Sequence, residues 1–447
     1  MIAFKSSLRD LLRYPTAVLG LVLIFLLMAV SVYALVTIPY KEAIFLWRGG
    51  ENVWYQNPKY APPAWMNFFS REKQPVSFAV STAGGSLPKT VTKGAEDTST
   101  VEIAYSFDYT YDAFPQEMIL YFRTKYDTKV PFVSVVWVTP DGREIRIGDM
   151  AVDRQQTFRL SQDQKLQKRL KTDKVMRALF VNPEANDSVP LKGTYQIKIV
   201  GVTFDSTADI DAEFVLHGNL FGIAGTDQYR RDLKLPLLYG TPIALAFGLL
   251  AALGTALLTM IIAAIGTWYG GWLDELIQRI TEVNLILPFL AILIMVGTFY
   301  SRSIWVILGV TILLSIFSGQ IKTYRAIFLQ SKESPYIEAA RAYGASSQRI
   351  IFSYLIPRMI PLLIPALVSS VPTFVFLEAS LAVLGLGDPV LPTWGKIIEN
   401  AFSDGALYRG LYYWVLEPAL LLMLTGFGFA MLGFALDRVF NPRLRDI

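Results

Sequence analysis

One stretch decides how this chain is organised: Ser334-Pro-Tyr-Ile-Glu338-Ala-Ala-Arg-Ala-Tyr-Gly344-Ala-Ser-Ser-Gln-Arg-Ile-Ile-Phe-Ser-Tyr-Leu-Ile-Pro357. Ser334 suits the N-cap of a helix, and Pro335 suits its first position, where no backbone N–H is needed. Gly344 predicts the end of this helix, because glycine readily adopts the conformation found at helix C-termini. Ser346 or Ser347 can then cap a second helix. The stretch therefore predicts a short helix, a turn and another helix.

The side chains of the first helix indicate a surface that another protein can receive. Glu338 lies in the first turns, where a negative charge suits the helix dipole, and Arg341 is spaced to pair with it. Ala339, Ala340 and Ala342 keep the helix thin, so that a groove on a partner could admit it.

Apolar runs on both sides of this stretch predict membrane spans. The chain has 447 residues, of which 53% are hydrophobic and 17% charged, too apolar a balance for an ordinary soluble protein. The uncharged run 16–38 would rise about 34 Å as a helix, enough to cross a hydrocarbon core of about 30 Å. It exceeds the apolar region of a signal peptide, so we expect a retained anchor. The expected spans are 16–38, 237–266, 283–300, 304–321, 353–384 and 412–435, six in all, of which the second and fifth carry Gly or Pro and are the ones expected to kink.

Basic residues predict the orientation of these spans. They gather before the first span, after the last and between the fourth and fifth, and the positive-inside rule places all three regions in the cytoplasm. These residues are Lys5, Arg9, Arg13, Lys322, Arg325, Lys332, Arg341, Arg349, Arg358, Arg438, Arg443 and Arg445. Both termini are then cytoplasmic. A further cytoplasmic loop is expected between the second and third spans, although it is not basic, and it holds Asp274, Glu275, Arg279 and Glu282.

The region between the first two spans has a different character. Short runs of alternating apolar and polar residues recur between turn signals such as Asp141-Gly142, a pattern typical of an antiparallel β-sandwich. Only residues 150–176 read as helical or loop-like. We therefore expect an α-helical polytopic membrane protein with an inserted, mainly-β extracytoplasmic domain. Its expected parts are 1–39 (cytoplasmic N-terminus and first helix), 40–224 (β-rich domain) and 225–447 (membrane core), with a cytoplasmic loop at 333–348.

The composition excludes several kinds of chemistry. Cysteine is absent and His217 is the only histidine, so disulfides, thiolate sites and histidine metal clusters are excluded. A net charge of +4 is too small to indicate nucleic-acid binding. No phosphate-loop signature occurs, so ATP and Mg would be bound by other subunits. We assign this chain no catalytic residue, metal or cofactor.

The stretch from Ser334 resembles the EAA motif of permease subunits of ATP-binding-cassette (ABC) importers: Glu-Ala-Ala, three residues, Gly, nine residues, then Ile-x-Leu-Pro. Glu338, Ala339, Ala340, Gly344 and Pro357 match in register, while Tyr354 and Ile356 replace the family's Ile and Leu. The resemblance implies that this segment, including Arg341, is a coupling helix. In the family this helix docks into a cleft on the ATPase subunit and transmits its closure to the membrane helices.

Further stretches resemble signatures of dipeptide and oligopeptide permeases. Gly225-Thr-Asp-Gln-Tyr-Arg-Arg-Asp232 is similar to their Gly-Thr-Asp-x-x-Gly-Arg-Asp, with Arg230 in place of the glycine. Its matching residues are Gly225, Thr226, Asp227, Arg231 and Asp232. We favour a structural elbow, with Thr226 or Asp227 capping a short helix, over a substrate contact. Leu377-Glu378-Ala-Ser-Leu and Pro392-Thr-Trp394-Gly395 resemble the same subfamily.

Glu378 falls within an apolar span. An ionisable side chain there either faces an aqueous pathway or steadies a helix contact, and both alternatives remain open.

The resemblance implies a permease of the second type in a dipeptide or oligopeptide importer of the cell membrane. Its expected partners are a second homologous permease, two ATPase subunits, an extracytoplasmic solute-binding protein and the lipid bilayer. The same importer class also carries oligosaccharides or metal chelates. Alternatives of another class are an ion-coupled secondary transporter and a membrane-anchored extracellular sensor or enzyme. Residues 40–224 would either hold the binding protein or cap the partner permease, and Asn186 begins a glycosylation sequon of a kind that often occurs by chance.

Overall fold

The computed structural model describes residues 11, 13–94, 98–185, 189–205 and 207–440. The chain divides into two compact units, Gly49–Lys234 and a helical unit made of Met1–Arg48 with Leu235–Ile447. The signature Gly225–Asp232, expected within the membrane core, belongs by its contacts to the first of these units. Lys5, Arg9, Arg443 and Arg445, used above to predict topology, lie outside the described residues, as does Asn186.

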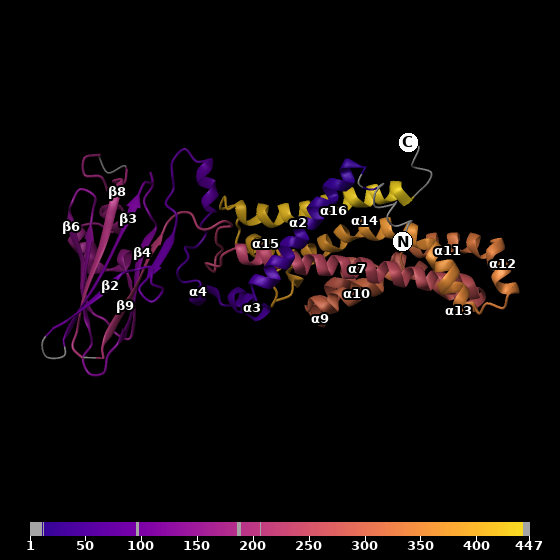
Figure 1. Cartoon of the computed structure of the whole chain (residues 1–447), viewed down its shortest axis with the longest axis horizontal. Helices are drawn as coiled ribbons and strands as arrows, with labels where there is room; N and C mark the ends of the chain where they lie inside the picture. Colours follow the sequence, from indigo (N-terminus) through magenta and orange to yellow (C-terminus); the bar gives the residue numbers. More distant parts are fainter. Residues whose placement is uncertain (1–10, 12, 95–97, 186–188, 206, 441–447) are drawn as a thin grey trace. The chain divides into compact units, whose positions relative to one another are not determined.

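Long apolar helices dominate the helical unit (Figure 1). Within the described part of the chain, four are long and apolar enough to cross a membrane. They are α2 (Pro15–Thr37), α7 (Lys234–Tyr269), α14 (Ile356–Leu381, with π-helical turns at Ile350–Leu355 and Ala382–Leu386 on either side) and α16 (Tyr413–Phe440). With 36 residues, α7 is about 54 Å long, so it reaches beyond a hydrocarbon core of about 30 Å. The predicted apolar spans are confirmed in these four helices.

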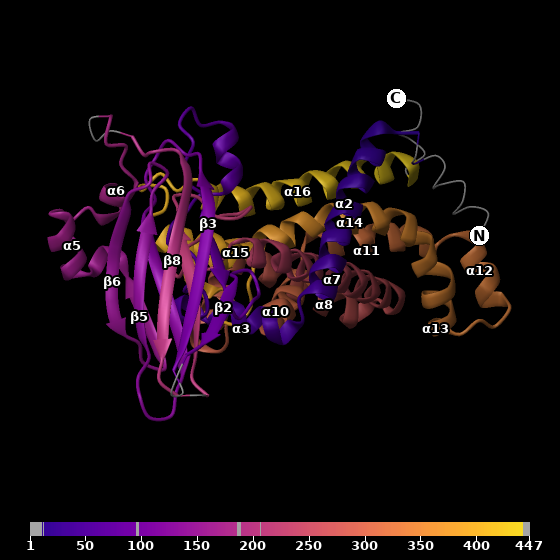
Figure 2. The same cartoon turned by 60° about the vertical axis from the view of Figure 1, so that its left-hand side comes forward.

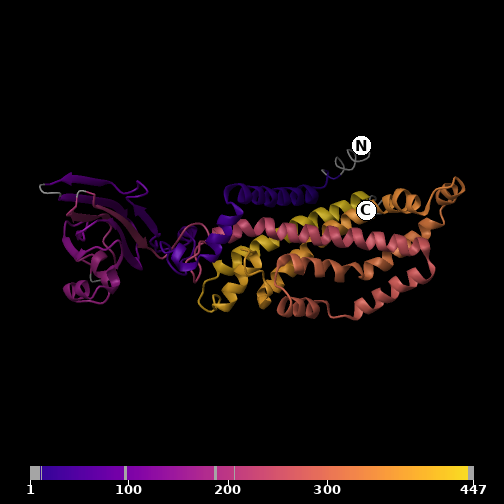
Figure 3. The ribbon, with the colours of Figure 1, turned by 90° about the horizontal axis from the view of Figure 1, so that it is seen from below.

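Two further apolar segments are broken helices rather than simple spans. Helices α8 (Gly271–Ile286) and α9 (Phe289–Phe299) meet at 80°, and α10 (Ile304–Ile316) and α11 (Gly319–Lys332) meet at 47° (Figure 3). The first break has a local cause, because Leu287 precedes Pro288 and is therefore driven into an extended conformation. If each pair counts as one span, the described residues contain up to six.

These breaks differ from the kinks expected from sequence. Helix α7 runs without interruption through Pro242, and α14 does so through Pro361, Pro365 and Pro372. All four charged residues of the loop expected between the second and third spans lie on helix α8, so this stretch is helical, while its cytoplasmic position stays a prediction. Asp274 is fixed there by Arg325 of α11, whose Nε lies 2.8 Å from Oδ1 and whose Nη2 lies 2.5 Å from Oδ2.

Glycines let the long helices approach one another closely. A Cβ added to Gly20 of α2 would lie 2.8 Å from the carbonyl oxygen of Gly428 on α16. One added to Gly248 of α7 would lie 2.5 Å from the Val375 side chain on α14. Close approach at small residues drives helix association in membranes, where burial of apolar surface contributes little. Shorter helices complete the unit: α3 (Tyr40–Arg48), α12 (Pro335–Ala342), α13 (Ser347–Arg349) and α15 (Trp394–Ser403).

The unit Gly49–Lys234 confirms the predicted β-rich region (Figure 2). Its described strands pair antiparallel in two sheets, of order β1-β9-β4-β7 and β2-β3-β8-β5-β6. The strands are β1 (Phe78–Ser81), β2 (Lys89–Lys93), β3 (Ser99–Tyr109), β4 (Glu117–Lys125), β5 (Phe132–Val138), β6 (Glu144–Ala151), β7 (Gln155–Arg159), β8 (Gly193–Thr203) and β9 (Asp209–His217). Helices α4 (Gly50–Val53), α5 (Gln164–Leu170) and α6 (Val175–Phe180) accompany them.

A shared aromatic core holds the two sheets together. Trp137 of β5 stacks on Tyr195 of β8 with ring centroids 5.3 Å apart, and Phe107 of β3 meets Phe214 of β9 at 6.0 Å. Trp137, Tyr195 and Phe214 are fully buried. The region 150–176 is mixed, since it contains β7 as well as α5.

Candidate functional site

Helix α12 has the boundaries that its sequence predicts. Pro335 occupies the first turn after an extended Ser334, whose hydroxyl does not cap the helix and donates instead to the Gln330 carbonyl oxygen at 3.4 Å. Gly344 has a φ of +77° at the other end. There the Gly344 N–H donates to the Arg341 oxygen at 2.9 Å and the Ala345 N–H to the Ala340 oxygen at 3.0 Å. This pair of bonds is a Schellman motif, which requires a left-handed residue at Gly344.

The next turn is also capped as predicted. The Ser346 hydroxyl accepts a hydrogen bond from the Arg349 N–H at 3.4 Å, so Ser346 rather than Ser347 is the cap. A π-helical turn at Ile350–Leu355 then leads into α14, where Pro357 lies in the first turn. Pro357 has no N–H to donate to the helix that precedes it, and it lies just after this π-helical turn, where the regular α-helical hydrogen bonds are already altered.

One side of α12 is open to solvent. Ile337 and Ala340 are buried against the unit, whereas Glu338, Ala339 and Ala342 are exposed. Tyr343, just before the turn, is 92% exposed. An acidic side chain, two small residues and an aromatic ring therefore form a narrow exposed ridge, which we call the α12 ridge (Glu338, Ala339, Ala342 and Tyr343).

The expected ion pair between Glu338 and Arg341 is absent from the described residues. The Arg341 guanidinium lies instead over the Trp268 ring of α7, 4.5 Å from its centroid. The expectation was wrong because an indole face offers Arg341 a partly buried contact, whereas the exposed Glu338 carboxylate offers only a screened one. The Glu338 carboxylate is consequently left facing solvent.

Two more cations attach the α12 region to the long helices. The Lys332 ammonium donates to the carbonyl oxygens of Thr267 and Trp268, each at 3.1 Å, and so satisfies the C-terminal end of α7. Arg358 of α14 lies 5.2 Å from the ring centroid of Tyr336 on α12. Helix α12 is thus tied to α7 on one side and to α14 on the other.

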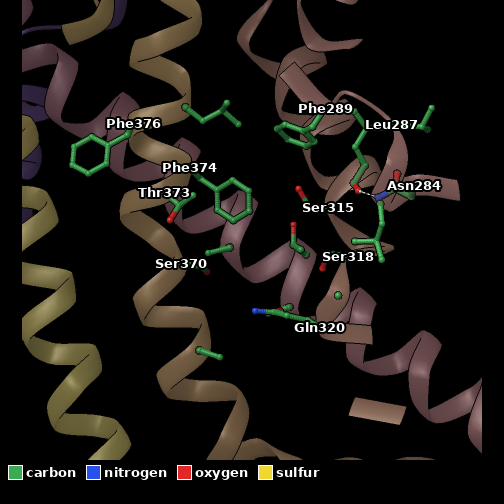
Figure 4. A pocket seen from close by; sticks show the side chains of 18 of the residues that line it. Asn284, Leu287, Phe289, Ser315, Ser318, Gln320, Ser370, Thr373, Phe374 and Phe376 are labelled. Carbon is green, nitrogen blue, oxygen red and sulfur yellow. Dashed lines mark hydrogen bonds between the residues drawn. The ribbon is translucent and has the colours of Figure 1, made fainter. Parts of the chain in front are cut away.

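A cavity lies between the long and the broken helices (Figure 4). It has a volume of 890 Å³ and is lined from α7, α14 and both broken pairs. The described side chains that line it are neutral, and several carry hydroxyl or amide groups: Asn284, Ser315, Ser318, Gln320, Ser370 and Thr373, with Phe289, Phe374 and Phe376 beside them.

Asn284 explains how the breaks are tolerated beside this cavity. Its amide NH2 donates to the carbonyl oxygens of Leu314 at 2.8 Å and Phe317 at 3.1 Å, at the end of α10 (Figure 4). These carbonyls lose their helical partners where α10 stops, and an unsatisfied carbonyl at membrane depth is costly. The sequence contains the signal for these breaks, namely two unusually short apolar segments interrupted by Pro288 and Ser318.

Glu378 does not line this cavity. It is 6% exposed on α14, and its carboxyl lies beside the Thr393 side chain. This contact favours the helix-contact alternative, while its role in a pathway stays a prediction.

The Trp394-Gly395 signature packs helix ends together. The Trp394 indole N–H donates to the Leu237 carbonyl oxygen at 2.9 Å, and the ring lies where a Cβ on Gly240 would approach within 2.6 Å. A Cβ on Gly395 would lie 2.7 Å from the Ala379 Cα. Both signature residues thus set how closely α15 approaches α7 and α14.

The Gly225–Asp232 signature forms a buried turn without the short helix expected for it. The Thr226 hydroxyl donates to the Pro58 oxygen at 2.8 Å and accepts from the Ala61 N–H at 3.0 Å. Asp227 is fully buried, 2.6 Å from the Arg231 guanidinium, and it also accepts from the backbone N–H of Arg231 at 2.9 Å. These contacts suit the structural elbow that we favoured.

Comparison with known proteins agrees with this architecture. Residues 244–446 match the family described as "Binding-protein-dependent transport system inner membrane component". The oligopeptide transport system permease protein OppC of Bacillus subtilis is 30% identical over 49% of this chain and 72% of its own length. The dipeptide permease DppC of the same organism is 30% identical over 49% and 68%. The glutathione transport system permease GsiD of Pectobacterium atrosepticum is 29% identical over 50% and 73%.

These helices and matches define a multi-pass membrane permease. The chain belongs to the family of binding-protein-dependent transport system inner membrane components, as a permease of ABC peptide importers. Such permeases are non-catalytic membrane subunits, which decides against the sensor, enzyme and ion-coupled alternatives.

Proposed function

We propose that this chain forms half of the pathway of an ATP-driven importer and that the α12 ridge docks onto an ATPase subunit. One observation carries the proposal: α12 is exposed on one side and is attached on the other to α7 and α14, which both line the 890 Å³ cavity. A motor that moves α12 would therefore act on two walls of the cavity. Glu338 would meet a basic group of the ATPase, and Tyr343 would insert as an aromatic anchor.

The proposed complex contains a second homologous permease, two ATPase subunits and an extracytoplasmic binding protein. In it each broken helix pair counts as one span, giving six spans with both termini in the cytoplasm. Lys322, Arg325 and Arg349, which flank α12, support a cytoplasmic position for the ridge by the positive-inside rule. The β-rich unit is then extracytoplasmic.

We propose dipeptides or oligopeptides as the transported substrates. The named relatives support this choice, and so does the lining of the cavity. Hydroxyl and amide groups can exchange hydrogen bonds with any peptide backbone, while the neutral lining holds no charged substrate tightly. Among the described residues no group of His, Asp or Glu could hold a metal ion, so the cavity itself gives no support to a bare-metal substrate.

For the β-rich unit we propose that it holds or orients the binding protein above the permease pair. The alternative is a cap that stabilises the partner permease. Replacing Gly49–Lys234 by a short linker and measuring binding-protein docking and complex assembly separates the two. Lost docking with intact assembly supports the first role.

Coupling is tested with Glu338→Lys and Gly344→Pro in a reconstituted transporter. Proline requires φ near −65°, which is incompatible with +77° at Gly344, so the turn after α12 would be rebuilt. Both variants should lose peptide uptake and substrate-stimulated ATP hydrolysis while still inserting into the membrane. Glu333→Lys, at an exposed glutamate just before α12, is the matched control and should transport normally. Normal uptake by both α12 variants would refute the coupling role.

A further inference from the structure

The β-rich unit contains a cavity of its own, with a volume of 460 Å³, beside β4 and β7. Alternate residues of β4 point away from the aromatic core, and cross-strand partners share this face. The pairs are Tyr121 with Thr157 and Arg123 with Gln155, and Arg159 lies opposite Ile119. Chain segment Glu51–Tyr55 forms another wall, with Tyr55 packed edge-to-face on Tyr121 at 4.7 Å.

Three arginines line this cavity: Arg123, Arg159 and Arg230. Among the described residues, the guanidinium groups of Arg123 and Arg159 have neither an ion pair nor a hydrogen bond. Arg230 is different, because it is only 12% exposed and is held in place. Its Nη1 donates to the Asn57 oxygen at 2.5 Å, and its Nε lies 3.6 Å from Glu51.

Arg230 also has an unusual backbone. Its φ is +64°, in the left-handed region, at the position where the peptide-permease signature has glycine. An L-residue in this conformation is strained compared with glycine. A strained arginine that lines a cavity together with two unpaired arginines is the arrangement expected where backbone strain serves a binding site.

The nearby carboxylates do not neutralise this cluster. Glu51 is engaged by Lys59 at 2.5 Å, and Glu213 accepts hydrogen bonds from the Tyr55 hydroxyl at 2.9 Å and from the Gln56 amide. His217 adds no charge at neutral pH, because burial lowers its pKa to about 4. Asp211, which lies opposite Arg123 on β9, is held by Lys89 at 3.1 Å. Glu51 lines the cavity beside Arg230, and among the described residues the Arg123 and Arg159 guanidinium groups have no ion-pair partner.

We propose that this cavity binds the C-terminal carboxylate of a short peptide. The choice of a peptide rests on the proposed import function, whereas the choice of a carboxylate rests on the arginines. Guanidinium groups bind carboxylates in a planar, two-bonded geometry, and Arg123 and Arg159 have their donors available for it. The Tyr55 and Tyr121 rings give the rest of the peptide an apolar wall, and 460 Å³ is within the usual range for small-molecule sites.

The test uses the purified full-length chain in lipid nanodiscs, without ATPase subunits, and isothermal titration calorimetry. The probes are trialanine, its C-terminal amide and inorganic phosphate. Trialanine should bind, and the amide should bind at least about tenfold more weakly, since it lacks the charged oxygens to which the guanidinium groups would donate. Arg123→Gln and Arg159→Gln should each weaken trialanine binding by a similar factor. Arg154→Gln, an exposed arginine outside the cavity, is the matched control and should bind normally.

Equal binding of trialanine and its amide would overturn the proposal, and so would unchanged binding by both cavity variants. Phosphate binding as tight as that of trialanine would show a general anion site and overturn the assignment to peptides. Melting temperatures identify a variant that fails to fold, and Arg123→Lys, which keeps the charge, should retain part of the affinity. Because the assay needs neither transport nor ATP, its failure is separate from failure of the α12 variants.

Discussion

Replacement of Trp268 by leucine tests the attachment of α12 to α7 most directly. The Arg341 guanidinium lies 4.5 Å from the centroid of the Trp268 ring, and the Lys332 ammonium lies 5.8 Å from it. A cation–π contact contributes about 0.5–1 kcal/mol at exposed sites and about 2 kcal/mol when desolvated. Trp268 is half-buried, so we expect a loss of about 1–2 kcal/mol of coupling, which corresponds to roughly 5- to 30-fold in an equilibrium constant.

The assay is peptide uptake per ATP hydrolysed by the complete transporter in proteoliposomes. Trp268→Leu should leave basal ATP hydrolysis close to its normal rate, because the α12 ridge itself is unchanged. Uptake per ATP should fall several-fold, since movement of α12 reaches α7 less completely. Trp272→Leu is the matched control. This tryptophan lies on α8 and is 75% exposed, so its replacement should leave uptake per ATP unchanged.

A double-mutant cycle distinguishes this role of Arg341 from direct contact with the ATPase. If Arg341 acts through Trp268, then Arg341→Gln and Trp268→Leu remove the same interaction, and the double variant should be little worse than either single one. Fully additive losses of uptake per ATP would show that Arg341 acts through a contact other than the one with Trp268. Normal coupling in Trp268→Leu would refute the mechanical link altogether.

Other predictions concern packing, pH and the cavity. Gly240→Ala should destabilise the chain by about 1–3 kcal/mol, seen as a lower melting temperature, because the new Cβ would lie 2.6 Å from Trp394. The pKa of His217 is lowered from 6.5 in the unfolded chain to about 4 in the folded one. As pH falls, the unfolded chain therefore binds this proton at a higher pH than the folded chain does, and the free energy of unfolding decreases between about pH 6.5 and 4. At pH 5 the loss should be about 2 kcal/mol, and His217→Gln should flatten the decline in melting temperature between pH 7 and 5. Asn284→Leu should leave the Leu314 and Phe317 carbonyls unsatisfied and reduce both melting temperature and uptake, whereas Gln320→Leu at the same cavity should affect uptake alone.

Features with a local cause could be predicted from the sequence. The limits of α12 follow from Pro335 and Gly344, whose own backbone preferences decide where the helix begins and ends. The four long helices follow from length and hydropathy alone. Alternation of apolar and polar residues sufficed for the β-rich region, because each half-buried strand must bury every second side chain.

Features that join distant parts of the chain could not be predicted. Arg341 could pair with Glu338 by helical spacing, and nothing in the sequence indicated that Trp268 would lie under it. The cavity on β4 and β7 likewise depends on strand register, which brings Arg123 and Arg159 to one face, while Arg230 also lines it. The charge of Glu378 made it a candidate pathway residue in the sequence. The residues that line the cavity are neutral and come from several helices, so none of these segments alone indicates that they lie together.

In the proposed mechanism, the attachments of α12 are the route by which an exposed helix of eight residues would act on the cavity. Trp268 lies at the end of the same α7 that contributes Thr255 to the cavity wall, and α14, reached through Tyr336, contributes Ser370 and Thr373. Packed helices are stiff along their axes, so a displacement of α12 would be carried along both without an intervening flexible loop. The π-helical turn at Ile350–Leu355 could absorb a small rotation or shift of the helix, because its hydrogen bonds join residues five apart instead of four. We therefore expect closure of the ATPases to change the spacing between α7 and α14 first, and the width of the cavity as its consequence.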